Sequence, residues 1–121
     1  MFLSRGDAPR LTVAQAHART RRGGGDAVLL DVREEPEWRA GHAPDAVHVP
    51  LSALAAGGGL PRAAQDRPLV VICRSGRRSQ QAARLLTARG ADAVDVEGGM
   101  NAWAAAGHPV VVEHGNSGPG T

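Results

Sequence analysis

The residues best suited to chemistry lie together in one stretch, Cys73-Arg-Ser-Gly-Arg-Arg-Ser79, directly after the apolar run Leu69-Val-Val-Ile72. Such a run predicts a buried parallel strand, and the polar, glycine-containing loop after it leads into a segment with helical spacing. Loop amides and a helix N-terminus then converge on one point and form an anion site. A thiol at that point has a lowered pKa and is available as a thiolate nucleophile. We therefore predict that Cys73, the only cysteine, is catalytic; the alternative is a small buried hydrophobic residue.

The elements that must position this loop alternate between apolar runs and helical patterns. Leu11 marks a short edge strand, and Thr12 with Gln15 forms a capping box for the helix that follows. The predicted strands cover residues 27–32, 47–49, 69–72 and 93–96, and the predicted helices cover residues 13–21, 34–40, 77–89 and 100–106, with helical turns over 51–56 and 61–65. This order predicts an α/β domain with a parallel sheet. Because ligands bind at the carboxyl ends of such strands, we expect Cys73 to share an edge with Asp31 if their strands are neighbours.

Composition limits the classes of protein and partner. The chain has 121 residues, 42% of them hydrophobic but only 2% aromatic, so aliphatic side chains must fill the core of a single domain. All 14 basic residues are arginines, which bind oxyanions with paired donors, and the formal net charge is only +2. No aromatic residues interleave with the cluster Arg19, Arg21 and Arg22, so we expect no nucleic-acid partner.

The same sequence predicts a cytoplasmic protein. One cysteine cannot form an internal disulfide, no apolar run approaches the ~20 residues of a membrane span, and the N-terminus is too short and polar for a signal peptide. We expect a flexible lead-in over 1–9, one domain over 10–112 and a disordered tail over 113–121. The five histidines lack ligand spacing and no phosphate-binding glycine motif is present, so we expect neither a metal nor a cofactor.

Four separated motifs, in order, resemble the rhodanese (sulfurtransferase) family over residues 11–112. They are Leu30-Asp-Val-Arg33 with Glu37, Gly41-His-Ala-Pro-Asp-Ala-Val-His-Val-Pro50, the stretch from Cys73 to Ser79, and Gly98-Gly-Met-Asn-Ala-Trp103 with Gly107-His-Pro109. The resemblance implies a central parallel sheet of about five strands with helices on both faces. It also implies transfer of a sulfane sulfur atom through a persulfide on Cys73.

By this resemblance, the Cys73 thiolate takes sulfur from thiosulfate or a similar small anionic donor and passes it to cyanide, a small thiol or a protein thiol. Arg74 and Arg77 are the expected donor-binding residues, although Arg77 can equally face solvent. Arg78 either braces the loop or contacts substrate, and Ser79 is expected to cap the helix rather than contact sulfur. The predicted substrate-binding set is Arg74, Ser75, Gly76, Arg77, Arg78 and Ser79, in a monomer or a homodimer.

Five further residues match supporting positions of the family. Asp31 and Arg33 are expected to pair at the edge of the sheet, with Glu37 as a further partner of Arg33. His42 has an expected structural hydrogen bond, with a general-base role as the alternative, and Trp38 is expected to line the pocket. Trp103 is expected to pack in the core.

Three other functions compete with this prediction. Phosphatases with a cysteine nucleophile place one residue more between cysteine and arginine than the four between Cys73 and Arg78, and Ser79 stands where their arginine would be. A non-enzymatic docking or regulatory module typically has the cysteine replaced, whereas Cys73 is present. A persulfide-based sulfide sensor, or a carrier between proteins, would share the chemistry and differ in turnover or acceptor.

Overall fold

A five-stranded, entirely parallel sheet organises the chain, in the order β1-β5-β4-β2-β3. The computed structural model describes residues 9–112. The strands are β1 (Arg10–Leu11), β2 (Val28–Asp31), β3 (Val47–His48), β4 (Leu69–Ile72) and β5 (Ala93–Val96). The helices are α1 (Val13–Thr20), α2 (Glu35–Ala40), α3 (Leu51–Ala55), the 3-10 turn η1 (Arg62–Ala64), α4 (Arg78–Ala88) and α5 (Gly99–Ala105).

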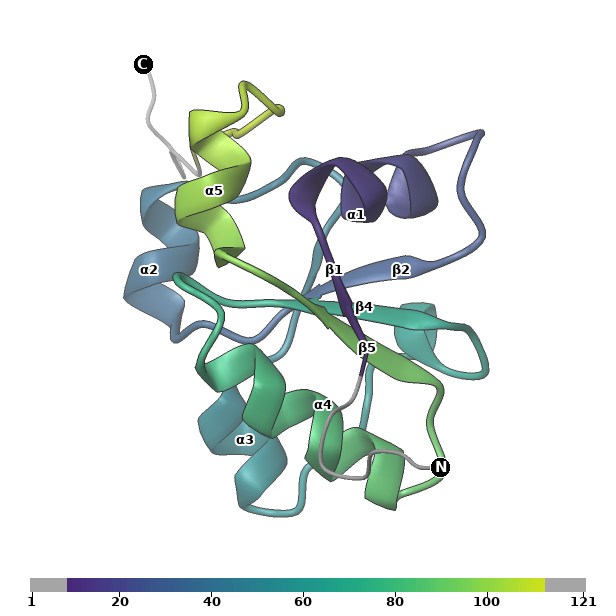
Figure 1. Ribbon diagram of the computed structural model, residues 1–121. Coiled ribbons are helices and arrows are strands. Elements are labelled where there is room, and N and C mark those ends of the chain that lie inside the picture. The colour runs from purple at the N-terminus through teal and green to yellow at the C-terminus, as the bar shows by residue number, and fades with distance from the viewer. Residues whose placement is uncertain (1–8, 113–121) are drawn as a thin grey trace.

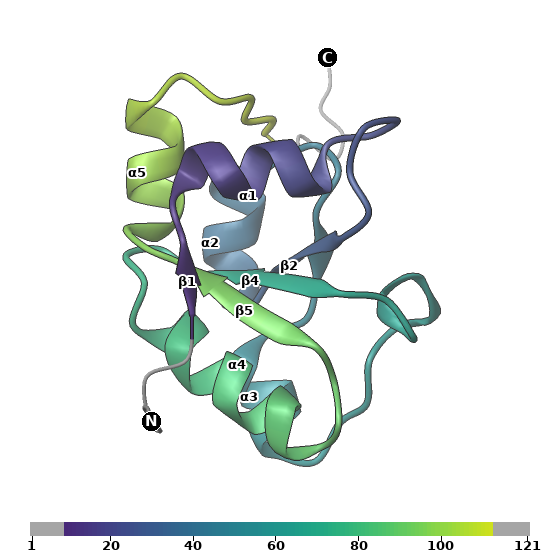
Figure 2. The same ribbon diagram turned by 45° about the vertical axis from the view of Figure 1, so that its right-hand side comes forward.

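Helices cover both faces of the sheet, with α1 and α5 on one side and α3 and α4 on the other (Figures 1 and 2). Alternate residues of the central strands point to opposite faces, as the period of two requires. Leu30, Val71 and Cys73 therefore pack in the core beneath α3 and α4. Leu29 and Ile72 pack in the second core, with Trp103 of α5. Every residue of β2 and β4 is buried, and all except Asp31 at the end of β2 are apolar, as expected of strands covered on both faces.

The predicted elements are all present, with ends that differ by about one residue. The capping box that begins α1 is formed: the Gln15 amide donates to Thr12 Oγ1 at 3.1 Å, and the Thr12 amide donates to Gln15 Oε1 at 2.9 Å. Strands β2 and β4 are neighbours, with Asp31 opposite Ile72. The prediction that the segments after these strands share one edge is confirmed.

Helix α5 begins against the loop that follows β4. The amides of Met100 and Asn101 donate to the carbonyls of Cys73 and Arg74 at 2.7 and 3.0 Å. Gly99 permits this contact, because a Cβ atom there would lie 2.3 Å from the Cys73 carbonyl oxygen. Gly99 therefore allows the start of α5 to pack against the loop that follows β4.

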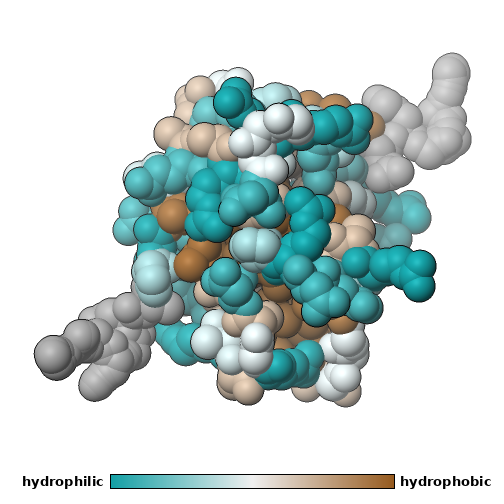
Figure 3. Space-filling view, turned by 90° about the vertical axis from the view of Figure 1, so that its right-hand side faces the viewer, coloured by the Kyte–Doolittle hydropathy of each residue, from teal (hydrophilic) through white to brown (hydrophobic). Residues whose placement is uncertain are grey.

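Most of the predicted lead-in over 1–9 and all of the predicted tail over 113–121 lie outside the described residues. Between residues 9 and 112, no helix is long and apolar enough to cross a membrane. The side of the molecule in Figure 3 is mainly hydrophilic, with apolar side chains visible in small areas between polar ones. The large hydrophobic residues that are exposed in the described range are Val110, Val111 and Val112.

Candidate active site

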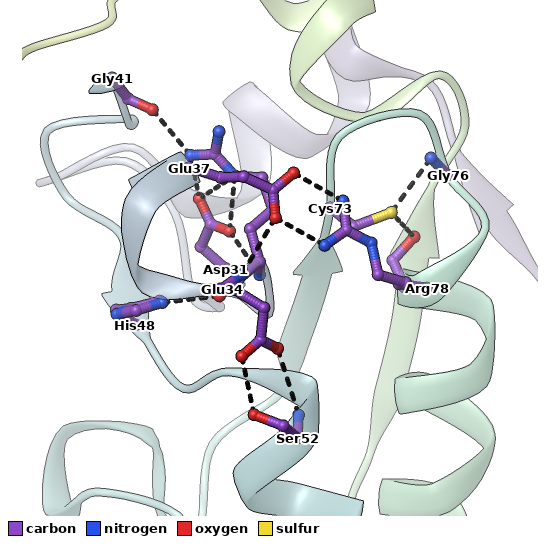
Figure 4. Close-up of polar contacts among 11 residues, drawn as sticks. Asp31, Glu34, Glu37, Gly41, His48, Ser52, Cys73, Gly76 and Arg78 are labelled. Carbon is purple, nitrogen blue, oxygen red and sulfur yellow. Dashed lines mark hydrogen bonds and ion pairs between the residues drawn. The ribbon is translucent and has the colours of Figure 1, made fainter. Parts of the chain in front are cut away.

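Cys73 lies directly after β4, at the carboxyl edge of the sheet, and only 1% of the residue is exposed. The Gly76 amide donates a hydrogen bond to Cys73 Sγ at 3.1 Å (Figure 4). Ser79 Oγ lies 3.4 Å from the same sulfur. The backbone of Gly76 has φ of 101°, a left-handed conformation that favours glycine. This turn aims the Gly76 amide back at the sulfur, so the loop is built around Sγ.

The surroundings of Cys73 favour its thiolate form. Burial raises the pKa of the thiol, because a charge is costly away from water. Hydrogen bonds from the Ser79 hydroxyl and from the amides of Ser79, Gly76 and Ser75 outweigh burial and lower the pKa of Cys73 below its ordinary value. A thiolate with several oriented donors is the species that acts as a nucleophile.

Ser79 does not cap the helix, and the prediction that it would is wrong. The N-cap of α4 is Arg77, which makes no side-chain capping bond, and Ser79 lies within the first turn. Its buried hydroxyl donates to Asp95 Oδ2 at 2.8 Å and faces Cys73 Sγ. The helix continues through Ser79, so its side chain points inward to the sheet instead of closing the helix end.

Two charged residues that the sequence analysis did not single out lie beneath the loop. Asp95 of β5 is 2% exposed and accepts hydrogen bonds from Arg10 Nε and Nη2, both at 3.0 Å. Arg10 Nη2 also donates to the Gly76 carbonyl at 2.7 Å. The available signal was an aspartate inside the apolar run of β5, since a buried charge requires a partner.

Arg78 braces the loop against α2. Its Nη1 and Nη2 donate to the two carboxylate oxygens of Glu37 at 2.7 and 2.8 Å (Figure 4). The expected pairing of Glu37 with Arg33 is limited to a contribution of the Arg33 charge to the lowered pKa of Glu37, because the hydrogen bonds of the Glu37 carboxylate go to Arg78 and to the Glu34 amide. The bidentate hydrogen bond from Arg78 outweighs burial and lowers the pKa of Glu37 to about 2.

Asp31 and Arg33 form a buried ion pair at the neighbouring strand end. Arg33 Nη2 donates to Asp31 Oδ2 and to the Gly41 carbonyl, both at 2.7 Å. His48 Nε2 lies 2.7 Å from the Arg33 carbonyl oxygen. These bonds fix the segment between β2 and α2, and hence the position from which Glu37 reaches Arg78.

Arg74, Ser75 and Arg77 form the exposed side of the loop. Arg74 also lines a cleft of about 430 Å³ between α2 and α5, together with Arg33, Glu37 and Asn101. Neither Arg74 nor Arg77 makes a side-chain hydrogen bond or ion pair with another residue of the described range. Their guanidinium groups are therefore available to an anion that approaches the loop.

Trp38 is not among the residues that line this cleft. Its indole stacks on His42 and His48, with ring centroids 3.5 and 4.6 Å apart. His42 is 7% exposed, and its Nδ1 lies 2.8 Å from the Trp38 carbonyl oxygen. This contact is the kind of structural hydrogen bond that was expected for His42. Trp103 is buried in the core as predicted.

Within residues 9–112, no three potential metal-ligating side chains lie close enough together to hold an ion.

The fold and this site together define a class: a parallel α/β protein with a buried cysteine of lowered pKa in a loop of backbone donors after a central strand. The profile of the rhodanese-like domain matches residues 13–106, and the chain belongs to that family as an enzyme of the rhodanese transferase type. The thiosulfate sulfurtransferase GlpE of Pseudomonas savastanoi pv. phaseolicola is 38% identical over 97 residues, 79% of this chain and 87% of that protein.

Solved structures agree with this assignment. A rhodanese-related protein from Thermoplasma volcanium aligns with a TM-score of 0.72 and 33% identity, over 86% of this chain and 98% of that one. A protein from Rhodopseudomonas palustris, described as a possible tyrosine phosphatase, aligns with a TM-score of 0.73 and 29% identity, over 86% of this chain and 85% of that one. The fold is thus shared with a protein described as a possible phosphatase, so the choice of chemistry rests on the loop.

Proposed function

We propose that the protein transfers a sulfane sulfur atom from thiosulfate, or a similar small anionic donor, to a thiophilic acceptor through a persulfide on Cys73. The observation that carries this proposal is the thiolate-favouring loop around Sγ, with the Gly76 amide 3.1 Å from the sulfur. The likeness to a thiosulfate sulfurtransferase supports the choice of donor.

In the loading step, the Cys73 thiolate attacks the outer sulfur of thiosulfate. A bond forms between Sγ and that sulfur, the sulfur–sulfur bond of thiosulfate breaks, and sulfite leaves with the electron pair. The negative charge then rests on the outer sulfur of the persulfide, where the loop amides stabilise it. Arg74 and Arg77 bind the sulfonate oxygens, since both guanidinium groups are exposed beside the loop.

In the discharge step, the acceptor attacks the outer sulfur of the persulfide. Cyanide, a small thiolate or a protein thiolate forms the new bond, and the electron pair of the broken bond returns to Sγ. Cys73 is again a thiolate, so the cycle needs no metal and no separate redox partner. Hydrogen bonds that lower the pKa of Cys73 also make Sγ a better leaving group in this step.

Two features of the loop favour sulfur over phosphate as the transferred group. Four residues separate Cys73 from Arg78, one fewer than in cysteine phosphatases, so the loop is a tighter cradle. In addition, both Nη atoms of Arg78 are engaged with the Glu37 carboxylate. An arginine held in this way braces the loop instead of clamping a tetrahedral phosphate.

Intact mass spectrometry tests the proposal. The purified protein should gain the mass of one sulfur atom with thiosulfate and lose it with cyanide. Cys73→Ser should fold, as judged by circular dichroism, and gain nothing. A wild-type protein that is folded, has a free thiol and gains no mass would refute thiosulfate as the donor. A gain that persists in Cys73→Ser would refute the persulfide on this residue.

A further inference from the structure

The Ser79 hydroxyl lies between two anionic acceptors. Its oxygen is 3.4 Å from Cys73 Sγ and 2.8 Å from Asp95 Oδ2, and all three residues are buried. A hydroxyl has one proton to donate. When Cys73 is a thiol, its S–H donates to Ser79 and the hydroxyl proton goes to Asp95. When Cys73 is a thiolate, the thiolate and the carboxylate compete for that single proton.

Arg10 determines how strongly the carboxylate competes. It donates to both oxygens of Asp95, and its Nη2 also donates to the Gly76 carbonyl at 2.7 Å. The amide of the same glycine donates to Sγ. One guanidinium from the edge strand therefore supports two of the hydrogen-bond donors of the sulfur, the Ser79 hydroxyl through Asp95 and the Gly76 amide through the carbonyl of the same residue.

We propose that Asp95 and Arg10 are positioning residues that adjust the charge on Cys73 Sγ by directing the Ser79 hydroxyl proton, an inference that rests on the proposed sulfur transfer. When Cys73 is a thiolate, the Ser79 hydroxyl donates its proton to Sγ, and the Asp95 carboxylate keeps only its hydrogen bonds from Arg10. In the persulfide, Sγ is neutral and the charge is on the outer sulfur, so the proton turns to Asp95. Discharge returns the charge to Sγ and reverses the rotation. The hydroxyl thus follows the charge without any residue gaining or losing a proton.

Several other charged groups surround Cys73, and each single variant leaves all of them unchanged except the one that it replaces. Arg10 and Arg78 both interact electrostatically with Cys73, and each also interacts with an acidic neighbour. The charged groups that interact with the sulfur or with its partners are Arg10, Asp95, Glu97, Arg78, Glu37 and Glu34, and Arg74 and Arg77 are exposed residues of the loop itself. Differences between single variants and the wild type therefore isolate the altered residue.

The test is the pH profile of Cys73 alkylation by iodoacetamide, which reports the thiol pKa without any sulfur donor. Ser79→Ala removes a donor and should raise that pKa by roughly one pH unit, the size of a charge-assisted hydrogen bond. Asp95→Asn replaces the competing carboxylate by a weaker acceptor and should lower the pKa by up to about one unit. Arg10→Gln makes the Asp95 carboxylate a stronger acceptor for the Ser79 proton and removes a cation near Sγ, so it should raise the pKa of Cys73.

If the two residues direct the Ser79 proton, the pKa of Cys73 should fall in Asp95→Asn and rise in Arg10→Gln. If the substitutions merely damage the loop, Sγ loses hydrogen-bond donors in both variants and the pKa should rise in both. The shift caused by Asp95→Asn should fall to less than half in the Ser79→Ala background. Asp92→Asn is the matched control, since this exposed aspartate precedes β5 and should leave the profile unchanged. Equal shifts with and without the Ser79 hydroxyl, or shifts of the same sign in the Asp95 and Arg10 variants, would overturn the proposal.

A second readout concerns the two half-reactions. A thiolate of lower pKa is a weaker nucleophile and a better leaving group, with a change of about threefold per pH unit of pKa. At a pH where both proteins are ionised, Asp95→Asn should therefore slow loading by up to about threefold and speed discharge by a similar factor. Both rates falling together would contradict the assignment. If thiosulfate loads no protein, the proposed function fails, while the alkylation profile still decides the role of Asp95.

Discussion

The ion pair between Glu37 and Arg78 gives a sharp test of how the loop is held. The perturbation is Glu37→Gln, which removes the charge but retains the size of the side chain. The Glu34 amide donates to Glu37 Oε1 at 3.1 Å, and a glutamine oxygen can accept the same bond. The variant therefore weakens the link between α2 and the loop while leaving the local helix start intact.

The magnitude follows from the pKa of Glu37. The hydrogen bond from Arg78 lowers it from the ordinary 4.5 to about 2. Without screening by water and salt, this lowering of the Glu37 pKa would correspond to about 3 kcal/mol of folding free energy at neutral pH. The two side chains are 30% and 33% exposed, so water and salt screen the pair. We expect Glu37→Gln to reduce the free energy of unfolding by about 1–2 kcal/mol at pH 7.

The pH dependence has a defined sign. Because the pKa of Glu37 is lower in the folded state, the stabilisation is complete above about pH 4.5 and is lost as the pH falls towards 2. Urea unfolding of the wild type and Glu37→Gln at several pH values between 7 and 3 should show their difference shrinking, with less than half remaining at pH 3.

A matched control is available on the same helix. Glu35 pairs with Arg39 at 3.1 Å, but these side chains are 63% and 67% exposed. Glu35→Gln should therefore cost at most a few tenths of a kcal/mol. Equal losses in the Glu35 and Glu37 variants, or a Glu37 difference that does not change with pH, would refute the bracing role of Arg78.

Two further predictions concern the loop itself. Gly76→Ala should destabilise the protein by about 1–3 kcal/mol in urea unfolding and abolish sulfur loading, because its φ is 101° and a Cβ atom would lie 2.9 Å from Arg10 Nη2. A loaded, fully stable variant would contradict this view of the turn. Arg74→Ala should raise the KM for thiosulfate roughly tenfold with kcat nearly unchanged, as loss of a partly exposed ionic hydrogen bond requires. In steady-state kinetics, a fall confined to kcat would instead place Arg74 on the transition state.

The elements of the sheet were predictable because their signals are local. The apolar runs that form β4 and the first three residues of β2 require burial on both faces, and the Thr12–Gln15 capping box fixes the start of α1. The place of Cys73 at the start of the loop was predictable for a related reason. Cys73 directly follows the apolar run of β4 and directly precedes a glycine-containing loop, and both of these signals are local in the sequence.

The pairing of side chains across the site was not predictable, because it depends on the order and register of the strands. Glu37 and Arg78 are 41 residues apart, and Arg10 and Asp95 are 85 apart. Arg33 lies near Glu37 in sequence and was the natural partner on local grounds. It is instead occupied by Asp31 and the Gly41 carbonyl, which leaves Glu37 to Arg78.

The shortest strand illustrates how fold and chemistry are joined. β1 has only two residues and adds little to either core, yet its pairing with β5 places Arg10 directly opposite Asp95. That register brings one cation to a buried carboxylate and to the carbonyl of the loop glycine. A buried aspartate without this partner would destabilise the sheet, and a loop without it would lose an anchor on Gly76. The edge strand therefore matters less for burial than for placing Arg10 beneath the loop that holds Cys73.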